Sequence, residues 1–474
     1  MHNYWYYLSE YIETNRYTLY LAIFLISLSL IAKFTKGIQW PTSNKALWIT
    51  ISLGIGLRCV WLMYSSHTPL MEWQPWATDF DYINIHALDM KHGKWFLNAI
   101  GEPIARRPIG YPLFLGLVYA VFGSHIAVAW IANLVLFIVG ILFLHKITAF
   151  ISNRQIAWLA VVGYSIFPMS IYSIKMTTDE HLFMPVWLAS IYILLRLVNN
   201  KAMRGAWIWF GLTAAYATMI RTHAIFMPVL AAIMFVIMRK PWKQVVGILL
   251  SSVLILLCIS VPWLMRNQRV FDAPILFGAT SCFVYAQVNS SAQPEGLGHI
   301  PLVGEEGYSL EVDQAIKSGN SAKAHQACSE AMKQWIVSHP IEFVDMGLKR
   351  LLLYMRWDRQ GVWATWHQFA EKSSDPSRPV SAEMKELFEE LYYIYYYMLF
   401  FMSIFAVIAL FVHRKSISKQ NVINLLVVSG CFFFWFCEHM VIYPDRKYRF
   451  PLEILMLLPA CWLIYLWSRP RRIK

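Results

Sequence analysis

Long apolar runs separated by short polar stretches are the main pattern along this chain. Runs near the length of a bilayer-spanning helix occur at about 17–32, 46–65, 125–144, 155–170, 181–195, 205–220, 223–238, 244–261, 391–412, 421–437 and 450–467. The charged residues gather mainly between them. The pattern therefore predicts an all-α polytopic membrane protein, a bundle of about eleven transmembrane helices whose individual ends are fixed only to within several residues.

Composition supports this fold class. Hydrophobic residues make up 58% of the 474 positions and charged residues only 15%, which is too apolar for a soluble globular domain. The net charge of +13 would suit nucleic-acid binding, but the basic residues fall in short clusters between apolar runs. The many Trp, Tyr and Phe residues are typical of interfacial belts and bundle cores. We therefore expect no nucleic-acid partner.

The basic clusters set the predicted orientation. They lie at 33–45, 146–154, 196–204, 239–243, 414–419 and 469–474. With eleven helices all six fall on the same side of the membrane, and by the positive-inside rule that side is cytoplasmic. The C-terminus is therefore expected inside. The first run has no basic region before it and no small-residue cleavage site after it, so we expect a retained span and not a signal peptide.

The predicted topology divides the chain into four parts. Residues 1–45 form an extra N-terminal transmembrane helix with its cytoplasmic loop. Residues 46–261 form the main transmembrane module, including a first external loop at 66–124, and 391–474 hold the C-terminal helices. The external segment, 262–390, has helical patterning after Pro340, with one apolar stripe made of Val344, Leu348, Leu351 and Met355. Of the seven cysteines, only Cys282 and Cys328 are placed to pair outside.

Eight cations on the predicted outer side contradict the charge rule. They are Arg106, Arg107, Arg221, Arg266, Arg269, Arg446, Lys447 and Arg449. An anionic ligand would explain them, and phosphate suits arginine because a planar guanidinium binds its oxygens in pairs. The alternative for any one of them is a long side chain reaching the membrane surface or pairing with an outer carboxylate.

Acidic residues on the same side are candidates for chemistry. In the first external loop, Asp79 and Asp81 precede a short helical pattern, where they could equally serve as an N-cap and as a first-turn charge. The apolar run at 111–122 is too short to span, so we expect it to lie in the interface or to re-enter. Asp179 and Glu180 precede an apolar helix, where acidic residues are functional candidates or caps.

Histidines also occur near the predicted outer surface. They are His181, His223 and His439, and no metal-ligand spacing links them. We therefore expect them to be hydrogen-bonding residues and not zinc ligands.

Five motifs in order resemble a known family. They are Asp79-Phe-Asp-Tyr82, the Arg-Pro-Ile-Gly-Tyr-Pro segment within 106–112, Asp179-Glu180 with the Arg221 turn, PWLMRNQRVF at 262–271 and RKYRFPLEILMLLPA at 446–460. Over 46–467 the chain resembles GT-C superfamily glycosyltransferases, specifically the bacterial relatives of protein O-mannosyltransferases and aminoarabinose transferases in glycosyltransferase family 39. Two features depart from that family: the acidic loop follows the second span instead of the first, and Ile109 stands where a second proline is usual.

The resemblance implies an inverting transfer of a sugar from a polyprenyl-phosphate donor, with undecaprenyl phosphate as carrier, to a hydroxyl of an envelope acceptor outside a bacterial inner membrane. It implies that Asp79 is the general base, with Asp81 as second choice. The predicted substrate contacts are Tyr82, Arg106, Arg107, Tyr111, Asp179, Glu180, Arg221, Arg266, Asn267, Arg446, Tyr448 and Arg449. A Mg²⁺ or Mn²⁺ requirement stays open, with Asp179 as a candidate ligand. The sequence does not identify the sugar or the acceptor.

Two other classes of function fit the same residues. A transporter or flippase for a lipid-linked anion would also place arginines in a groove, but it predicts inverted repeats and charges near mid-bilayer, and the sequence indicates neither. A non-catalytic binding subunit would leave the carboxylates dispensable.

Overall fold

The computed structural model describes residues 17–65, 79–94, 96, 103, 105, 107–201, 204–279, 282, 284–285, 302–305, 308–355, 382–412, 419–442 and 446–468. Within these ranges all regular elements are helices and no strand occurs. The all-α class predicted from the sequence is confirmed.

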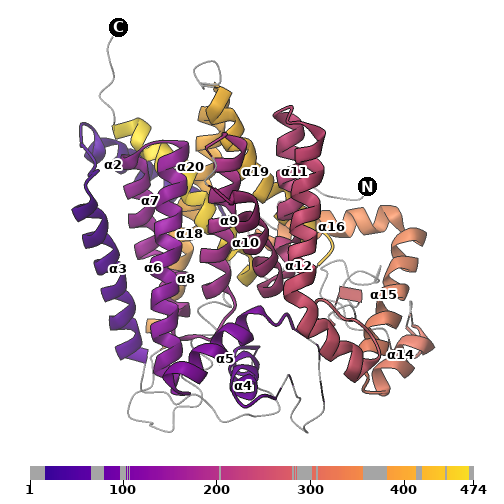
Figure 1. Cartoon of the computed structure of the whole chain (residues 1–474). Coiled ribbons are helices and arrows are strands. Elements are labelled where there is room, and N and C mark those ends of the chain that lie inside the picture. The colour runs from indigo at the N-terminus through magenta and orange to yellow at the C-terminus, as the bar shows by residue number, and fades with distance from the viewer. Residues whose placement is uncertain are drawn as a thin grey trace.

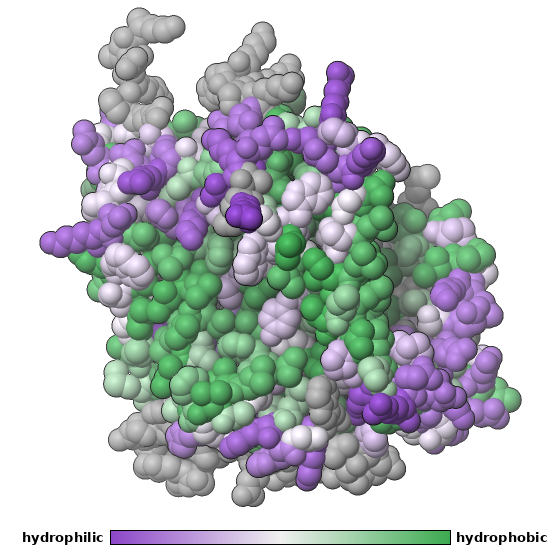
Figure 2. Space-filling model, viewed as in Figure 1, coloured by the Kyte–Doolittle hydropathy of each residue, from purple (hydrophilic) through white to green (hydrophobic). Residues whose placement is uncertain are grey.

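Most helices run side by side in one bundle (Figure 1). They are α2 (Tyr17–Thr35), α3 (Asn44–Ser65), α6 (Ile126–Ile151), α7 (Arg154–Ile166), α9 (Glu180–Val198), α10 (Ala206–Ile220), α11 (Met227–Ile237), α12 (Trp242–Phe271), α18 (Ala382–Val412), α19 (Lys419–His439) and α20 (Phe450–Ser468). Figure 2 shows an apolar band across this bundle with polar residues above and below it. The chain is an integral membrane protein, with its apolar face turned to lipid.

Fewer spans than predicted are identified among the described residues. Among the described residues, eight helices are long and apolar enough to cross a membrane, and a bent pair makes up to nine. That pair is α7 with α8 (Pro168–Tyr172), which meet at 53° because Pro168 cannot continue the hydrogen-bond ladder. The runs 205–220 and 223–238, which were predicted to span the membrane, form the shorter helices α10 and α11 in the structure. Eleven spans are therefore not confirmed.

A buried arginine compensates for the break at Pro168. Arg58 lies in α3, inside a run that the sequence pattern treats as a plain span, and its side chain is fully buried. Its guanidinium donates to the carbonyls of Tyr164 and Ser165 and to the hydroxyl of Ser170. The last carbonyls of a helix have no partners within that helix, so Arg58 satisfies those of α7 and holds the bend.

Helix α12 extends well past its predicted end. The uncharged run stops at residue 261, but α12 continues through Pro262, Arg266 and Asn267 to Phe271. Arg266 and Asn267 are thus carried on the last turns of a spanning helix and do not lie in a loop.

Two short helices cross one end of the bundle (Figure 1). α4 (Asp79–Lys91) packs against α5 (Gly110–Phe122), and α5 in turn contacts α6 and α10. The predicted short apolar segment 111–122 is therefore a helix too short to be a span. Gly110 permits its close packing, because a Cβ there would lie 2.6 Å from the carbonyl oxygen of Met219 in α10.

The segment between α12 and α18 forms a small helical unit beside the bundle (Figure 1). It contains α14 (Leu310–Lys317), α15 (Ser321–Ser338) and α16 (Pro340–Tyr354). A disulfide joins Cys282 to Cys328, as predicted. The predicted helix after Pro340 is confirmed, but two members of its apolar stripe, Val344 and Leu348, are exposed. Its buried side carries Met346, Arg350 and Tyr354 instead.

Candidate active site

A buried ion triplet lies where α9 begins and α10 ends. The Arg221 guanidinium binds both carboxylate oxygens of Asp179, with Nε–Oδ2 at 2.9 Å and Nη2–Oδ1 at 3.0 Å. Its Nη2 also donates to Glu180 Oε1. Only 4% of the Arg221 side chain is exposed, against 28% for Asp179 and 12% for Glu180. Three predicted site residues therefore meet in one cluster.

The structure distinguishes between the two predicted roles of Asp179, a functional residue and a helix cap. It occupies the N-cap position of α9, but its side chain makes no capping hydrogen bond and faces Arg221 instead. Burial would raise the pKa of the Asp179 carboxyl, but the neighbouring guanidinium outweighs this effect and lowers that pKa to about 2. Asp179 is therefore an ionised partner of Arg221 and not a helix cap.

The turn before α9 is fixed from the side by α6. Asn133, buried in the middle of α6, donates through Nδ2 to the carbonyls of Ile174 and Met176, each at 3.0 Å. Its Oδ1 accepts a hydrogen bond from the Tyr111 hydroxyl at 3.3 Å. The predicted contact Tyr111 is thus tied to the segment that delivers Asp179. The sequence analysis did not predict a role for Asn133, because a single amide side chain within an apolar run matches no motif.

Aromatic and histidine side chains complete the cluster. The Arg221 guanidinium lies 5.1 Å from the ring centre of Tyr448, which also approaches His223 and His439, with ring centres 5.6 and 6.1 Å apart. Tyr448 and His439 belong to the last part of the chain, whereas Arg221 and His223 lie between α10 and α11. Segments far apart in sequence therefore converge on the triplet.

Comparison with known proteins identifies the segment that carries this cluster. Residues 106–265 match the family model described as dolichyl-phosphate-mannose-protein mannosyltransferase, and Asp179, Glu180 and Arg221 all fall inside the match. The match covers about a third of the chain, and over these residues the sequence is similar to that mannosyltransferase family, in agreement with the predicted resemblance.

Solved structures similar to this chain include two crystal structures of ArnT from Cupriavidus metallidurans. The apo structure aligns at 13% identity with a TM-score of 0.39, covering 90% of this chain and 76% of that one. The structure bound to undecaprenyl phosphate aligns at 14% identity with a TM-score of 0.41, covering 89% and 76%. No curated protein matches the chain.

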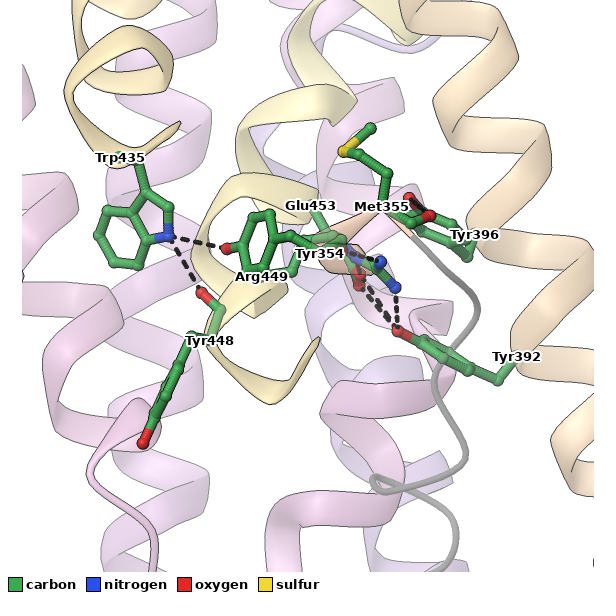
Figure 3. Close-up of polar contacts among 8 residues, drawn as sticks. All are labelled: Tyr354, Met355, Tyr392, Tyr396, Trp435, Tyr448, Arg449 and Glu453. Atoms are coloured by element: carbon green, nitrogen blue, oxygen red, sulfur yellow. Dashed lines mark hydrogen bonds and ion pairs between the residues drawn. The ribbon is translucent and has the colours of Figure 1, made fainter. Parts of the chain in front are cut away.

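Arg449 has a different environment from Arg221. It lies in the short helix η4 (Arg446–Arg449) with no exposed surface, and its Nε donates to Glu453 Oε1 at 2.6 Å. Nη1 donates to the Tyr354 carbonyl, and Nη2 to the hydroxyl of Tyr392. Figure 3 shows the Tyr448 ring pointing away from this network. We assign Arg449 to holding α16, α18 and α20 together, and we do not propose it as a phosphate contact.

A neighbouring cluster lies where α4 meets α12. Arg266 donates to the Phe96 carbonyl at 3.0 Å and to Asn267 Oδ1 at 2.8 Å. The amide of Asn267 is fully buried and donates to the Ile275 carbonyl, so this predicted contact is engaged within the protein. Burial, together with the charges of Arg107 and Arg266, lowers the pKa of His86 to about 4.

Arg107 links this cluster to the ion triplet. Its charge acts on His86 and also contributes to lowering the pKa of Asp179. The structure thus places Arg107 close enough to influence both groups, between α4 and the start of α9.

The structure does not describe the side chains of the remaining predicted residues. The helix α4 begins at Asp79, but the side chains of Asp79, Asp81 and Tyr82 are not described, nor is that of Arg446; Arg106 lies outside the described residues entirely. The assignment of the general base therefore stays a prediction.

An apolar groove of about 460 Å³ runs along α10, the helix that ends at Arg221. Helices α5, α9, α10 and α12 form its walls. Its lining residues are Ile109, Gly110, Leu113, Val186, Trp209, Leu212, Thr213, Tyr216, Met219, Ile259, Pro262 and Trp263. Met219 lies two residues before Arg221, and Trp263 packs under the Arg266 guanidinium at 5.1 Å. The groove therefore ends near both cation clusters.

The carboxylates and histidines do not form a metal-binding set. Among the residues that the structure describes, no three His, Cys, Asp or Glu side chains are arranged to hold a metal ion. Asp179, the predicted candidate ligand, directs both its oxygens at Arg221.

Proposed function

We propose that this protein transfers a sugar from a polyprenyl-phosphate donor to a hydroxyl of an envelope acceptor, with undecaprenyl phosphate as the carrier. The observation that carries the proposal is Arg221. Its Nη1 is buried without a hydrogen-bond partner among the described residues. Arg221 follows directly after α10, which forms one wall of an apolar groove, and it lies within a segment matched by a family of lipid-phosphate-sugar transferases. A guanidinium donor beside an apolar slot suits the phosphate of a prenyl chain.

The proposed reaction is a single displacement with inversion. Asp79, or Asp81 as second choice, takes the proton of the acceptor hydroxyl. The acceptor oxygen attacks the anomeric carbon on the face opposite the phosphate, the bond from that carbon to the phosphate oxygen breaks, and polyprenyl phosphate leaves with the bonding electrons. Arg221, with Arg107 and Arg266 nearby, stabilises the charge that develops on the departing phosphate.

The remaining predicted contacts have positional roles in this proposal. Tyr82 and Arg106 are proposed as donor contacts, and Tyr111 and Tyr448 line the site near Arg221. Glu180 positions Arg221 or the acceptor. Asp179, the candidate ligand for Mg²⁺ or Mn²⁺, has both carboxylate oxygens paired with Arg221.

The orientation in the proposal places the active site on the periplasmic side of a bacterial inner membrane with the C-terminus in the cytoplasm. The clusters of basic residues support it through the positive-inside rule. The disulfide between Cys282 and Cys328 also supports it, because disulfides persist in the periplasm and are rare in the cytosol.

The test is sugar transfer in proteoliposomes loaded with labelled undecaprenyl-phosphate sugars and an envelope extract. We expect Asp79→Asn or Asp81→Asn to abolish transfer, and Arg221→Gln to slow it by on the order of 10². A transporter would instead move the labelled lipid across the bilayer without transfer. Full activity in both Asp variants would contradict the proposed mechanism.

A further inference from the structure

Two buried histidines face each other beside the ion triplet. His223 lies in the short helix η2 (Thr222–Phe226), and His439 ends α19. Their ring centres are 5.3 Å apart, with 8% of His223 exposed and none of His439. The proposed reaction above gives neither of them a role.

Several polar atoms around this pair are buried without a hydrogen-bond partner. His439 uses Nδ1 on the Trp435 carbonyl at 2.8 Å, but its Nε2 has no partner among the described residues, nor has either ring nitrogen of His223. The same holds for Glu180 Oε2 and Arg221 Nη1. Folded proteins rarely leave buried polar atoms unpaired, so this concentration of them points to a polar ligand.

The position of the pair indicates which part of the donor it meets. The Tyr448 ring is a neighbour of Arg221 and also of both histidines. In the proposed donor the sugar is bonded directly to the phosphate. If Arg221 holds the phosphate, the sugar ring is the group that reaches the neighbouring histidines.

We propose that His223 and His439 form the binding site for the hydroxyl groups of the donor's sugar. This inference rests on the proposed function. A neutral imidazole has one hydrogen-bond donor and one acceptor. His223 offers both to a hydroxyl group, whereas His439, whose Nδ1 donates to the Trp435 carbonyl, offers the acceptor Nε2. The surrounding rings of Trp435, Tyr354 and Tyr448 exclude water. The pair therefore distinguishes a sugar-bearing carrier from the bare carrier phosphate.

The competing interpretation is that both rings only fill space. His223 stacks on Trp435 and His439 on Tyr354, with ring centres 5.0 and 4.2 Å apart. Phenylalanine at either position retains a stacking ring and removes the nitrogens, so the exchange separates packing from ligand binding.

The experiment compares the binding of undecaprenyl phosphate with that of undecaprenyl-phosphate hexoses to the full-length protein. We expect His223→Phe and His439→Phe each to weaken binding of the sugar-bearing lipid roughly tenfold and to leave binding of undecaprenyl phosphate unchanged. His223→Gln, which keeps a donor and an acceptor, should lose less. His145→Phe, on α6 away from the site, is the matched control and should bind both lipids as the wild type does.

Each result has a defined meaning. Equal weakening of both lipids, or no weakening of either, would overturn the inference, and thermal unfolding of each variant identifies losses caused by misfolding; His223→Gln then provides the decisive comparison. A wild-type protein that binds neither lipid and transfers no sugar would instead overturn the proposed function itself.

Discussion

Two arginines that look equivalent in sequence have different roles in the structure. Arg221 keeps one donor nitrogen unpaired among the described residues, whereas Arg449 is buried, pairs with Glu453 and donates to the Tyr354 carbonyl and the Tyr392 hydroxyl. Both were predicted as phosphate contacts, because both lie close to helix ends on the predicted outer side. The partners that separate them, Asp179 and Glu453, are visible only once the helices are packed.

Arg449 and Glu453 should therefore matter to stability. Removing one member leaves the other charge buried and unpaired, so Arg449→Met should destabilise the protein by about 3–5 kcal/mol. The double variant Arg449→Met with Glu453→Leu should be markedly less destabilised than either single one. Thermal unfolding in detergent measures this. Additive losses in the double variant would contradict a coupled pair.

At the scale of elements, the short helix α5 sets the position of the site. Its first residue, Gly110, belongs to the Arg-Pro-Ile-Gly-Tyr-Pro motif and packs on the backbone of Met219 and Ile220, directly before Arg221. The glycine of that motif is thus explained by a close approach between two helices. A side chain there would push α10 away and displace Arg221.

Gly110→Ala is expected to reduce transfer activity strongly while destabilising the fold by only about 1–3 kcal/mol. Gly56→Ala is the matched control, since a Cβ on Gly56 in α3 meets nothing within 4 Å. Initial rates and unfolding temperatures of the two variants test this. Unchanged activity in Gly110→Ala would show that the contact does not position Arg221.

Helix α4 should respond to pH through His86, which stacks on Phe96. Burial and the charges of Arg107 and Arg266 lower the pKa of His86 to about 4, from its ordinary value of 6.5. Because the pKa of His86 is lowered on folding, its imidazole binds a proton more readily in the unfolded chain than in the folded protein. The free energy of unfolding is therefore unaffected by this group above pH 6.5 and decreases as the pH falls from 6.5 toward 4. The unfolding temperature should fall across that window, and His86→Phe should reduce the fall. His92→Phe, just after α4, should leave it unchanged.

The sequence predicts the elements better than their ends. Apolar runs located every long span identified among the described residues, because apolar residues must face lipid. The run at 244–261 ends before the first charged residue, however, and α12 continues past that point because Arg266 and Asn267 find partners in the protein. Likewise Asp179, Glu180 and Arg221 were predicted as site residues, but the meeting of His223 with His439 was not, since it depends on how α19 packs against η2.

At the scale of the whole molecule, the disulfide between Cys282 and Cys328 tests both stability and orientation. Removing the disulfide with Cys282→Ser should lower the free energy of unfolding by roughly 2–4 kcal/mol. It should also make the helical unit α14 to α16 more susceptible to protease. Cys258→Ser, an exposed free cysteine on α12, should have no such effect. If the proposed orientation holds, the bond will be oxidised in intact cells; fully reduced thiols there would contradict it.

The groove beside Arg221 also has a kinetic consequence. Trp209 and Ile259 are exposed among its lining residues, on the apolar surface that faces lipid, so a long prenyl chain would enter sideways from the membrane and would not dissolve in water first. Encounter between enzyme and donor is then two-dimensional. Turnover in vesicles should follow the mole fraction of donor among the lipids, and diluting the vesicles with buffer should leave the rate per enzyme unchanged.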